Sequence, residues 1–370
     1  MKSGRTVVST TSSRSSPLLS SLPLLFLVRS CSSMTTTPLV PKQLRGVFCG
    51  SGSDGMSDPR LADAILGMII PTQQPKQEQT NVLYLGTATY DLPQFAERQT
   101  ARFRERHCHV SHLPLVNDVP SVTKLENDIR QAHVIVVGGG NTLFAIDRWK
   151  RLGIVPYLLK QAMERGAILT GGSAGAICWF DGGHSDSMDP DTYKTALQAK
   201  FSTTAATTVA DESSTATDNI KDWKYIRVPG LGFLPGLLCP HHDRRQSNGI
   251  LRAHDFDRML LQHPGEIGIG IDHWAALVVD GEDSYRVLSL QDKPGSVLHD
   301  NTFSDNAKGL PGIWIKRVVD GTVQSRVCPP KGKLSDILQP ASEIVQDTED
   351  MEQCRRDNPD DGPGLQPQED

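Results

Sequence analysis

The sequence predicts an α/β fold in which a doubly wound, mostly parallel sheet carries helices on both faces. Two observations support this prediction. Short apolar segments alternate with helix-like segments from residue 43 to residue 173, and strands that are buried on both faces have such continuous apolar runs. Glycine-rich turns follow several of these strands, at the carboxyl ends where open α/β sheets carry their binding sites.

The individual elements follow from the pattern of apolar residues along the chain. Strands are expected at residues 43–50, 81–88, 109–116, 133–140 and 167–173. Helices are expected at residues 59–70, 95–107, 121–132, 141–153 and 155–166. The later segment 265–290 alternates between apolar and polar residues and contains Asp280-Gly281, which predicts antiparallel strands that close the sheet.

Composition excludes several classes of protein. The net charge of −5 over 370 residues is too small to indicate a nucleic-acid or membrane partner. Seven cysteines are scattered along the chain without a C-x-x-C pair, which favours reduced thiols over a disulfide framework or a zinc site. The length allows a single α/β domain with extensions at both ends.

The two ends differ in composition from the middle. Residues 1–37 are rich in Ser and Thr, and no Asp or Glu precedes Asp54. This start suits an organelle transit peptide for a mitochondrion or plastid, or a secretory signal, because the apolar run 17–28 is too short to span a bilayer. A third interpretation is a cytoplasmic protein that begins at Met34. We expect a domain at 38–334, a mobile insertion at 202–219 and a disordered acidic tail at 335–370.

The strongest functional signal is the segment 171–176, Gly-Gly-Ser-Ala-Gly-Ala, between an apolar strand and a helix-compatible run. Only very small neighbours fit such a tight turn, which would lift the Ser173 hydroxyl above the sheet at a helix N-terminus. The Ala174 N–H could then face a developing oxyanion. A second donor is expected from the glycine triplet 138–140, which ends the preceding strand.

A serine nucleophile needs a histidine base and a carboxylate that orients this base. Eleven histidines are present, and His241 stands out because an apolar strand-like segment and Pro240 lead directly to it. Asp181, Asp186 and Asp189 follow the turn helix and are candidates for the acid.

Two other patterns are weaker. The segment 50–55 reads G-x-G-x-x-G after a strand, but the next strand lacks the acidic residue of a dinucleotide site. The cluster His107, Cys108, His109 and His112 suggests a metal, although its spacing on a strand is poor for zinc. We therefore expect no cofactor and no metal ion.

Four motifs, in this order and spacing, resemble peptidase E and its cyanophycinase relatives: GGGNT (138–142), GGSAGA (171–176), HSDS (184–187) and PHHD (240–243). The resemblance runs from about Gly46 to Val319 without the segment 202–219. It implies a fold like that of the class I glutamine amidotransferases, which is flavodoxin-like, with serine where those enzymes carry cysteine.

The resemblance also implies roles for individual residues. Ser173 matches the nucleophile, His241 the base and Asp186 the acid, although the spacing leaves Asp181 and Asp189 open. The N–H groups of Ala174 and Gly139 match the oxyanion hole.

The expected activity is hydrolysis of small peptides through an acyl-enzyme on Ser173. Relatives in the family act on N-terminal aspartyl dipeptides or on aspartate–arginine polymers. An acidic substrate would need a cation, for which Arg244 and Arg245 are candidates, and Asn141 is a further candidate for substrate binding. The expected partner is a small peptide, with no nucleic acid and no stable membrane insertion. The oligomeric state is left open, a homodimer included.

Two alternatives remain at this point. The pattern Gly171-x-Ser173-x-Gly175 also fits an α/β-hydrolase esterase, but such an enzyme should carry an HGGG-type loop early in the chain. A non-catalytic binding module on the same fold is the other alternative.

Overall fold

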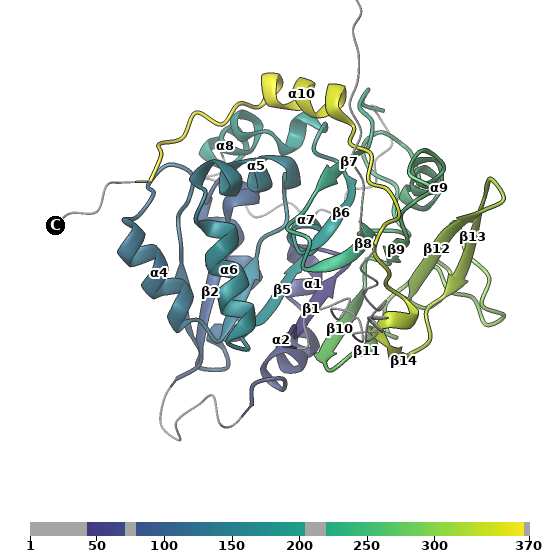
Figure 1. Cartoon of the computed structure of the whole chain (residues 1–370), viewed down its shortest axis with the longest axis horizontal. Coiled ribbons are helices and arrows are strands. Elements are labelled where there is room, and N and C mark those ends of the chain that lie inside the picture. The colour runs from purple at the N-terminus through teal and green to yellow at the C-terminus, as the bar shows by residue number, and fades with distance from the viewer. Residues whose placement is uncertain (1–42, 71–78, 204–219, 366–370) are drawn as a thin grey trace, which may run out of the picture. The chain divides into compact units, whose positions relative to one another are not determined.

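An eight-stranded sheet forms the centre of the fold and contains the parallel strands that the sequence predicts. In the computed structural model (Figure 1), which describes residues 43–70, 79–203 and 220–365, its strand order is β14-β11-β10-β1-β5-β4-β2-β3. The neighbours from β1 to β3 in this order are parallel, and the pairs on the other side of β1 are antiparallel. The strands are β1 (Gly46–Cys49), β2 (Asn81–Leu85), β3 (His109–His112), β4 (Val134–Val137), β5 (Ile168–Gly172), β10 (Ala275–Gly281), β11 (Ser284–Ser289) and β14 (Lys331–Lys333).

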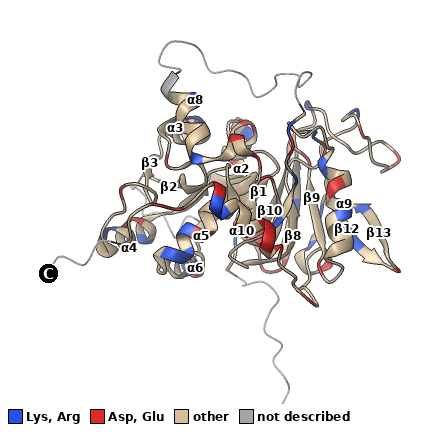
Figure 2. Ribbon diagram, turned by 90° about the horizontal axis from the view of Figure 1, so that it is seen from above, with Lys and Arg blue, Asp and Glu red and all other residues tan. Residues whose placement is uncertain are grey.

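Helices cover both faces of this sheet, as expected for a doubly wound fold. Figure 2 shows α2 and α3 on one side of β1 and β2, and α4, α5 and α6 on the other. Alternate residues of each strand enter different apolar clusters: Val82 packs with α2 and α3, whereas Leu83 packs with α4 to α6. The helices are α1 (Ser53–Met56), α2 (Pro59–Leu66), α3 (Pro93–Arg104), α4 (Val122–Gln131), α5 (Thr142–Leu152) and α6 (Val155–Glu164), with the 3-10 helix η2 (Thr87–Thr89).

A second, six-stranded sheet was not predicted. Its order is β13-β12-β9-β8-β6-β7, and β6, β8 and β9 are parallel. The strands are β6 (Phe180–Ser185), β7 (Ile226–Pro229), β8 (Leu234–Cys239), β9 (Gly268–Ile271), β12 (Ile313–Val319) and β13 (Thr322–Val327). The helices between β5 and β9 are α7 (Ala174–Ile177), η3 (Pro190–Thr192), α8 (Lys194–Thr203) and α9 (Arg252–Gln262).

The segment 265–290, expected to close one sheet, is divided between both. Its β10 and β11 form the antiparallel hairpin that we predicted, but β9 joins the second sheet as a parallel neighbour of β8. We had not expected β9 to join the second sheet. Its glycines allow this placement, because they let the chain approach its neighbours closely: a Cβ on Gly270 would lie 2.5 Å from the ring of His242.

The C-terminal segment is ordered where a disordered tail was expected. The 3-10 helix η4 (Leu334–Asp336) is followed by α10 (Thr348–Asp357), which lies along the fold beside α5 and β7 (Figure 1). Met351 and Cys354 are buried by this packing. The acidic, Pro-rich average composition concealed a short amphipathic helix, whose acidic first turn and basic last turn also suit the helix dipole. The folded unit therefore continues well beyond residue 334.

Several expectations concern residues that the structure does not describe. The segment 1–37 and the greater part of 202–219 lie outside the described residues, and residues 202 and 203 belong to the end of α8. Among the described residues, no helix has the length and apolar content needed to cross a membrane.

Candidate active site

Ser173 occupies the sharp turn between β5 and α7. Its backbone has φ 55° and ψ −124°, a conformation that costs a non-glycine residue about 1–3 kcal/mol. The neighbouring glycines are required by close backbone contacts: a Cβ on Gly172 would lie 1.9 Å from the Ser51 carbonyl oxygen, and one on Gly175 would lie 2.0 Å from that of Val137. The small residues of this segment therefore allow a strained serine at the carboxyl end of the central sheet.

Two free backbone donors flank Ser173. A Cβ on Gly139 would lie 3.4 Å from the Ser173 Cβ, so the glycine triplet that follows β4 runs directly beside the serine. Within the described part of the chain, neither the Gly139 N–H nor the Ala174 N–H donates a hydrogen bond. Unpaired donors beside a hydroxyl are the arrangement that stabilises an oxyanion.

His241 lies at the same edge of the sheet. It follows β8 and Pro240, and its backbone φ is also positive, at 57°. The Ser173 N–H donates to the Cys49 carbonyl (3.1 Å) and the His241 N–H donates to the Gly50 carbonyl (3.0 Å). Two consecutive carbonyls at the end of β1 thus hold the backbones of both residues.

The imidazole of His241 is kept neutral by its surroundings. Burial lowers its pKa well below the ordinary value of 6.5, and the neighbouring His273 and the charges of Arg252 and Arg244 lower this pKa further. A neutral imidazole is the form that can accept a proton from a hydroxyl.

The expectation that Asp186 orients His241 is wrong. Asp186 instead pairs with the buried Arg252, with 3.3 Å between Oδ2 and Nη1, because a guanidinium without any exposed surface needs a counter-charge. The two open alternatives also have other partners. Asp181 accepts a hydrogen bond from the Gly236 N–H at 3.2 Å, and Asp189 accepts one from the Ser247 hydroxyl at 3.1 Å.

The residue that contacts the His241 imidazole is His273. Their Nδ1 atoms are 2.9 Å apart, and the Nε2 of His273 lies 3.1 Å from Oδ2 of Asp54. The hydrogen bond from His273 is the largest cause of the lowered pKa of Asp54. Asp54 also pairs with Arg98 at 2.8 Å.

Sequence reasoning missed both residues, although signals for them were present. His273 follows β9, whose Gly270 is in register with Cys239 of β8, so the two histidines leave adjacent parallel strands at the same end. Asp54 belongs to the G-x-G-x-x-G segment that we had dismissed as a dinucleotide site. That segment instead forms the short loop after β1 and the start of α1, beside Ser173.

The backbone of His273 is fixed on both sides. Its N–H donates to Oδ1 of Asp243 at 2.7 Å, and its carbonyl accepts a hydrogen bond from the Ser51 hydroxyl at 2.7 Å. Burial and the nearby Asp272 raise the pKa of Asp243 to about 6. The position of the His273 ring is therefore set by its main chain as well as by its own two ring contacts.

His242, the neighbour of His241, belongs to the core. It has no exposed side-chain surface and packs against the rings of Phe303, Trp314 and Phe256. Its Nδ1 lies 3.4 Å from Oδ1 of the buried Asp272. This side chain cannot reach a substrate from that position.

The three candidate substrate-binding residues differ in their availability. The Asn141 side chain is buried and occupied, since its oxygen caps α5 at the Phe144 N–H (3.0 Å) while its amide donates to Ser187 and Thr192. Arg245 is exposed and donates to the Gly249 carbonyl at 3.3 Å. Arg244 is nearest to the site: its N–H donates to the His241 carbonyl (2.9 Å), and its Nε is buried without a hydrogen-bond partner in the described residues.

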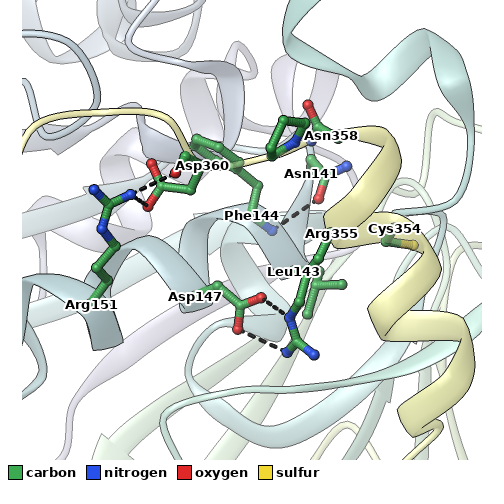
Figure 3. Close-up of a pocket in the computed structure, with 10 residues that line it drawn as sticks. Asn141, Leu143, Phe144, Asp147, Arg151, Cys354, Arg355, Asn358 and Asp360 are labelled. Carbon is green, nitrogen blue, oxygen red and sulfur yellow. Dashed lines mark hydrogen bonds and ion pairs between the residues drawn. The ribbon is translucent and has the colours of Figure 1, made fainter.

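A cavity of about 400 Å³ lies away from Ser173, between α5 and the C-terminal segment (Figure 3). Its charged walls are already paired: Arg355 binds Asp147 (2.7 Å), and Arg151 binds Asp360 (3.1 Å). None of the proposed catalytic side chains lines this cavity. The described residues contain no cluster of His, Cys, Asp or Glu with the geometry of a metal site.

Comparison with known proteins adds family information to this geometry. The profile of peptidase family S51 matches residues 50–287, more than half of the chain. A Trypanosoma brucei brucei protein named G2/mitotic-specific cyclin-1 is 29% identical over 327 residues, which cover 84% of this chain and 92% of that protein. The uncharacterized peptidase YgaJ of Bacillus subtilis (strain 168) is 32% identical over 170 residues, covering 46% of this chain and 58% of YgaJ.

The fold was also compared with solved structures. The crystal structure of a peptidase from an acI-B1 Actinobacterium aligns with a TM-score of 0.44 and 16% identity, covering 79% of this chain and 98% of that chain.

Proposed function

Since the chain belongs to peptidase family S51 and is a serine-type peptidase, we propose that it hydrolyses small peptides through an acyl-enzyme on Ser173. One observation carries the proposal. Ser173 is held in a strained turn beside the free N–H groups of Gly139 and Ala174, at the strand edge from which His241 also projects.

In the proposed mechanism, the Ser173 Oγ attacks the carbonyl carbon of the scissile peptide bond while His241 takes the hydroxyl proton. The Gly139 and Ala174 N–H groups stabilise the resulting oxyanion. His241 then gives the proton to the leaving amine, and the acyl-enzyme forms. Water, deprotonated by the same histidine, releases the acid product and restores the Ser173 hydroxyl.

Replacing Ser173 by Ala tests the nucleophile. Ala is as small as Ser and is no more strained at φ 55°, so we expect a melting temperature close to that of the unchanged protein. The turnover number kcat for a cleaved dipeptide should fall by at least ~10³-fold, because the residual rate would come only from binding and the oxyanion donors. Near-normal turnover in Ser173→Ala would falsify the assignment.

For the substrate, we propose dipeptides with an N-terminal aspartate, recognised through Arg244. The support is the position of its guanidinium, which is close enough to His241 and Asp54 to lower the pKa of both. Its only ion pair among the described residues is with Asp243, at 3.9 Å. A guanidinium without a close partner can bind a substrate carboxylate bidentately.

Asp-X and Asn-X dipeptides, which have the same shape, test this specificity. Loss of a desolvated contact between arginine and a carboxylate costs about 1.5–3 kcal/mol, so kcat/KM should be roughly 10- to 100-fold higher for Asp-X. Arg244→Glu should remove this preference. Arg245→Glu is the matched control, because Arg245 directly follows Arg244 in the chain but its side chain is exposed. This variant should keep the preference for Asp-X. Equal kcat/KM for the two dipeptides would exclude acidic specificity and leave the serine mechanism intact.

We do not propose the esterase or the non-catalytic binding module as a second function. The match to a peptidase family favours peptide hydrolysis over both.

A further inference from the structure

We propose that His273 and Asp54 are positioning residues for catalysis, so that a second imidazole stands where a serine hydrolase usually has its carboxylate. The contacts that the structure shows join His241, His273 and Asp54, with 2.9 Å between the two histidine Nδ1 atoms and 3.1 Å between His273 Nε2 and Asp54 Oδ2. This inference rests on the proposed function and names what orients its base.

Counting protons along the contacts fixes the tautomer of each ring. Two nitrogens 2.9 Å apart share one hydrogen, so one Nδ1 donates and the other accepts. The Asp54 carboxylate is an acceptor only, and it therefore favours the proton of His273 on Nε2. The Nδ1 of His273 is then the acceptor, and His241 must carry its own proton on Nδ1.

This arrangement leaves the Nε2 of His241 with a free lone pair. That nitrogen is then available to accept the Ser173 proton, which is the tautomer that a general base requires. If His273 presented an N–H at Nδ1 instead, His241 would be held in the opposite tautomer and could not act as a base.

During the reaction only one proton moves onto the imidazoles. The Ser173 O–H bond breaks, an N–H bond forms at His241 Nε2, and the electron pair of the hydroxyl forms the new bond to the substrate carbon. His273 stays neutral and accepts the Nδ1–H of the His241 imidazolium. The negative charge of Asp54 stabilises that cation through one intervening ring.

We call the connected residues His241, His273 and Asp54 the relay. The charged groups around the relay keep Asp54 ionised. Arg98 pairs with its Oδ1 at 2.8 Å, and Arg98 and Arg244 both help to lower the pKa of Asp54 after the larger effect of the His273 hydrogen bond. Asp243 binds the backbone N–H of His273 and not its ring. Asp54 is thus the carboxylate that the structure gives to the His273 imidazole.

Labelling by a fluorophosphonate, which reacts covalently with activated serines, tests the relay without knowledge of the substrate. We expect Ser173 of the full-length protein to be labelled, and His273→Ala to be labelled about 10²- to 10⁴-fold more slowly, as when the orienting acid of a triad is lost. His273→Glu, which restores an acceptor for the His241 Nδ1–H, should recover at least a tenth of the rate. Asp54→Asn should slow labelling at least ~10-fold.

The control is His254→Gln on α9, a half-exposed histidine that pairs with Asp305, and it should react at the unchanged rate. If His273→Ala is labelled within about threefold of the unchanged protein, the relay is wrong although the proposed function stands. Loss of labelling in both His273→Ala and His273→Glu, with folding intact, would also overturn the relay. Absence of Ser173 labelling in the unchanged protein would instead refute the proposed function.

Nitrogen-15 NMR of the histidine rings measures the tautomer of each ring directly. A merely structural role of His273 would not require these particular tautomers. We expect the resonances of neutral Nδ1–H for His241 and neutral Nε2–H for His273, with a scalar coupling between the two Nδ1 nuclei across their hydrogen bond. The coupling should vanish in His273→Glu. An Nε2–H tautomer at His241 in the resting protein would contradict the proposal.

Discussion

At the scale of single residues, two of the ten described non-glycine residues with positive φ angles belong to the proposed mechanism. Ser173 and His241 both have positive φ angles without being glycine, and each such residue costs about 1–3 kcal/mol that the surrounding structure must offset. Two consecutive carbonyls at the end of β1 hold them there. Strain of this kind persists when it aims a side chain, and these are the two side chains that the proposed mechanism uses.

The adjacent histidines 241 and 242 give a prediction at this scale. His241→Ala should lose at least ~10³-fold in kcat while its free energy of unfolding stays within about 1 kcal/mol, because the ring, although largely withdrawn from solvent, keeps part of its surface exposed. His242→Ala should lower that free energy by ~2–4 kcal/mol, because it empties a site between three aromatic rings. Denaturant unfolding and dipeptide kinetics on both variants check this. If His242→Ala were inactive but as stable as the unchanged protein, His242 and not His241 would be the general base.

At the scale of elements, the C-terminal segment is held against α5 and Tyr90 by polar contacts. Arg148 of α5 has no exposed side-chain surface, and it donates to the carbonyls of Leu115 and Pro363 and to the Asp360 carboxylate. Asn358 binds the Tyr90 hydroxyl, which in turn donates to the Thr192 carbonyl. The segment after α10 thus supplies additional partners to polar groups that are buried in the fold.

Neighbouring aspartates in this segment provide a prediction with an internal control. Asp360→Asn should lower the free energy of unfolding by ~1–3 kcal/mol, because it leaves the buried Arg148 without its carboxylate. Asp361→Asn should change it by less than ~0.5 kcal/mol, because Asp361 is exposed where it pairs with Lys194. Urea unfolding of both variants measures the difference. Equal effects would mean that Asp360 contributes no more than a surface charge.

At the scale of the whole molecule, the two sheets share one apolar core. Leu277 of the first sheet and Leu238 and Ile269 of the second belong to the same buried cluster. The short helix α7 contacts β5 on one side and β6 and β8 on the other. The turn that carries Ser173 therefore lies where the two sheets meet, and it cannot shift without disturbing both.

The reactivity of the cysteine thiols indicates how tightly this core is closed. The six described cysteines are all buried and free, in line with the expectation of reduced thiols. Burial raises the pKa of Cys49 and Cys328 to about 11, which leaves almost no thiolate near neutral pH. We therefore expect at most one of the seven thiols to react with a disulfide reagent at pH 8, and all seven in denaturant. Rapid reaction of several thiols in the native protein would show that the core opens easily.

The sequence by itself determined the first sheet and the turn that carries the serine. Every strand expected up to residue 173 is present within a few residues of its expected limits. Such strands are recognisable because each is a local run of apolar residues that ends in a glycine turn. The serine and the N–H groups that we propose as oxyanion donors could be picked out for the same reason, since they lie within two short glycine-rich segments.

Tertiary structure alone decided which groups surround His241. Asp186, close to the serine in sequence, is drawn to the buried charge of Arg252. His273, in the turn after β9, and Asp54, in α1, come together although more than half of the chain separates them. No local pattern encodes that meeting, because it depends on β9 pairing with β8 and β10 pairing with β1. Spacing along the chain fixes strands and turns, whereas contacts between loops depend on strand order, which is set by packing across the whole core.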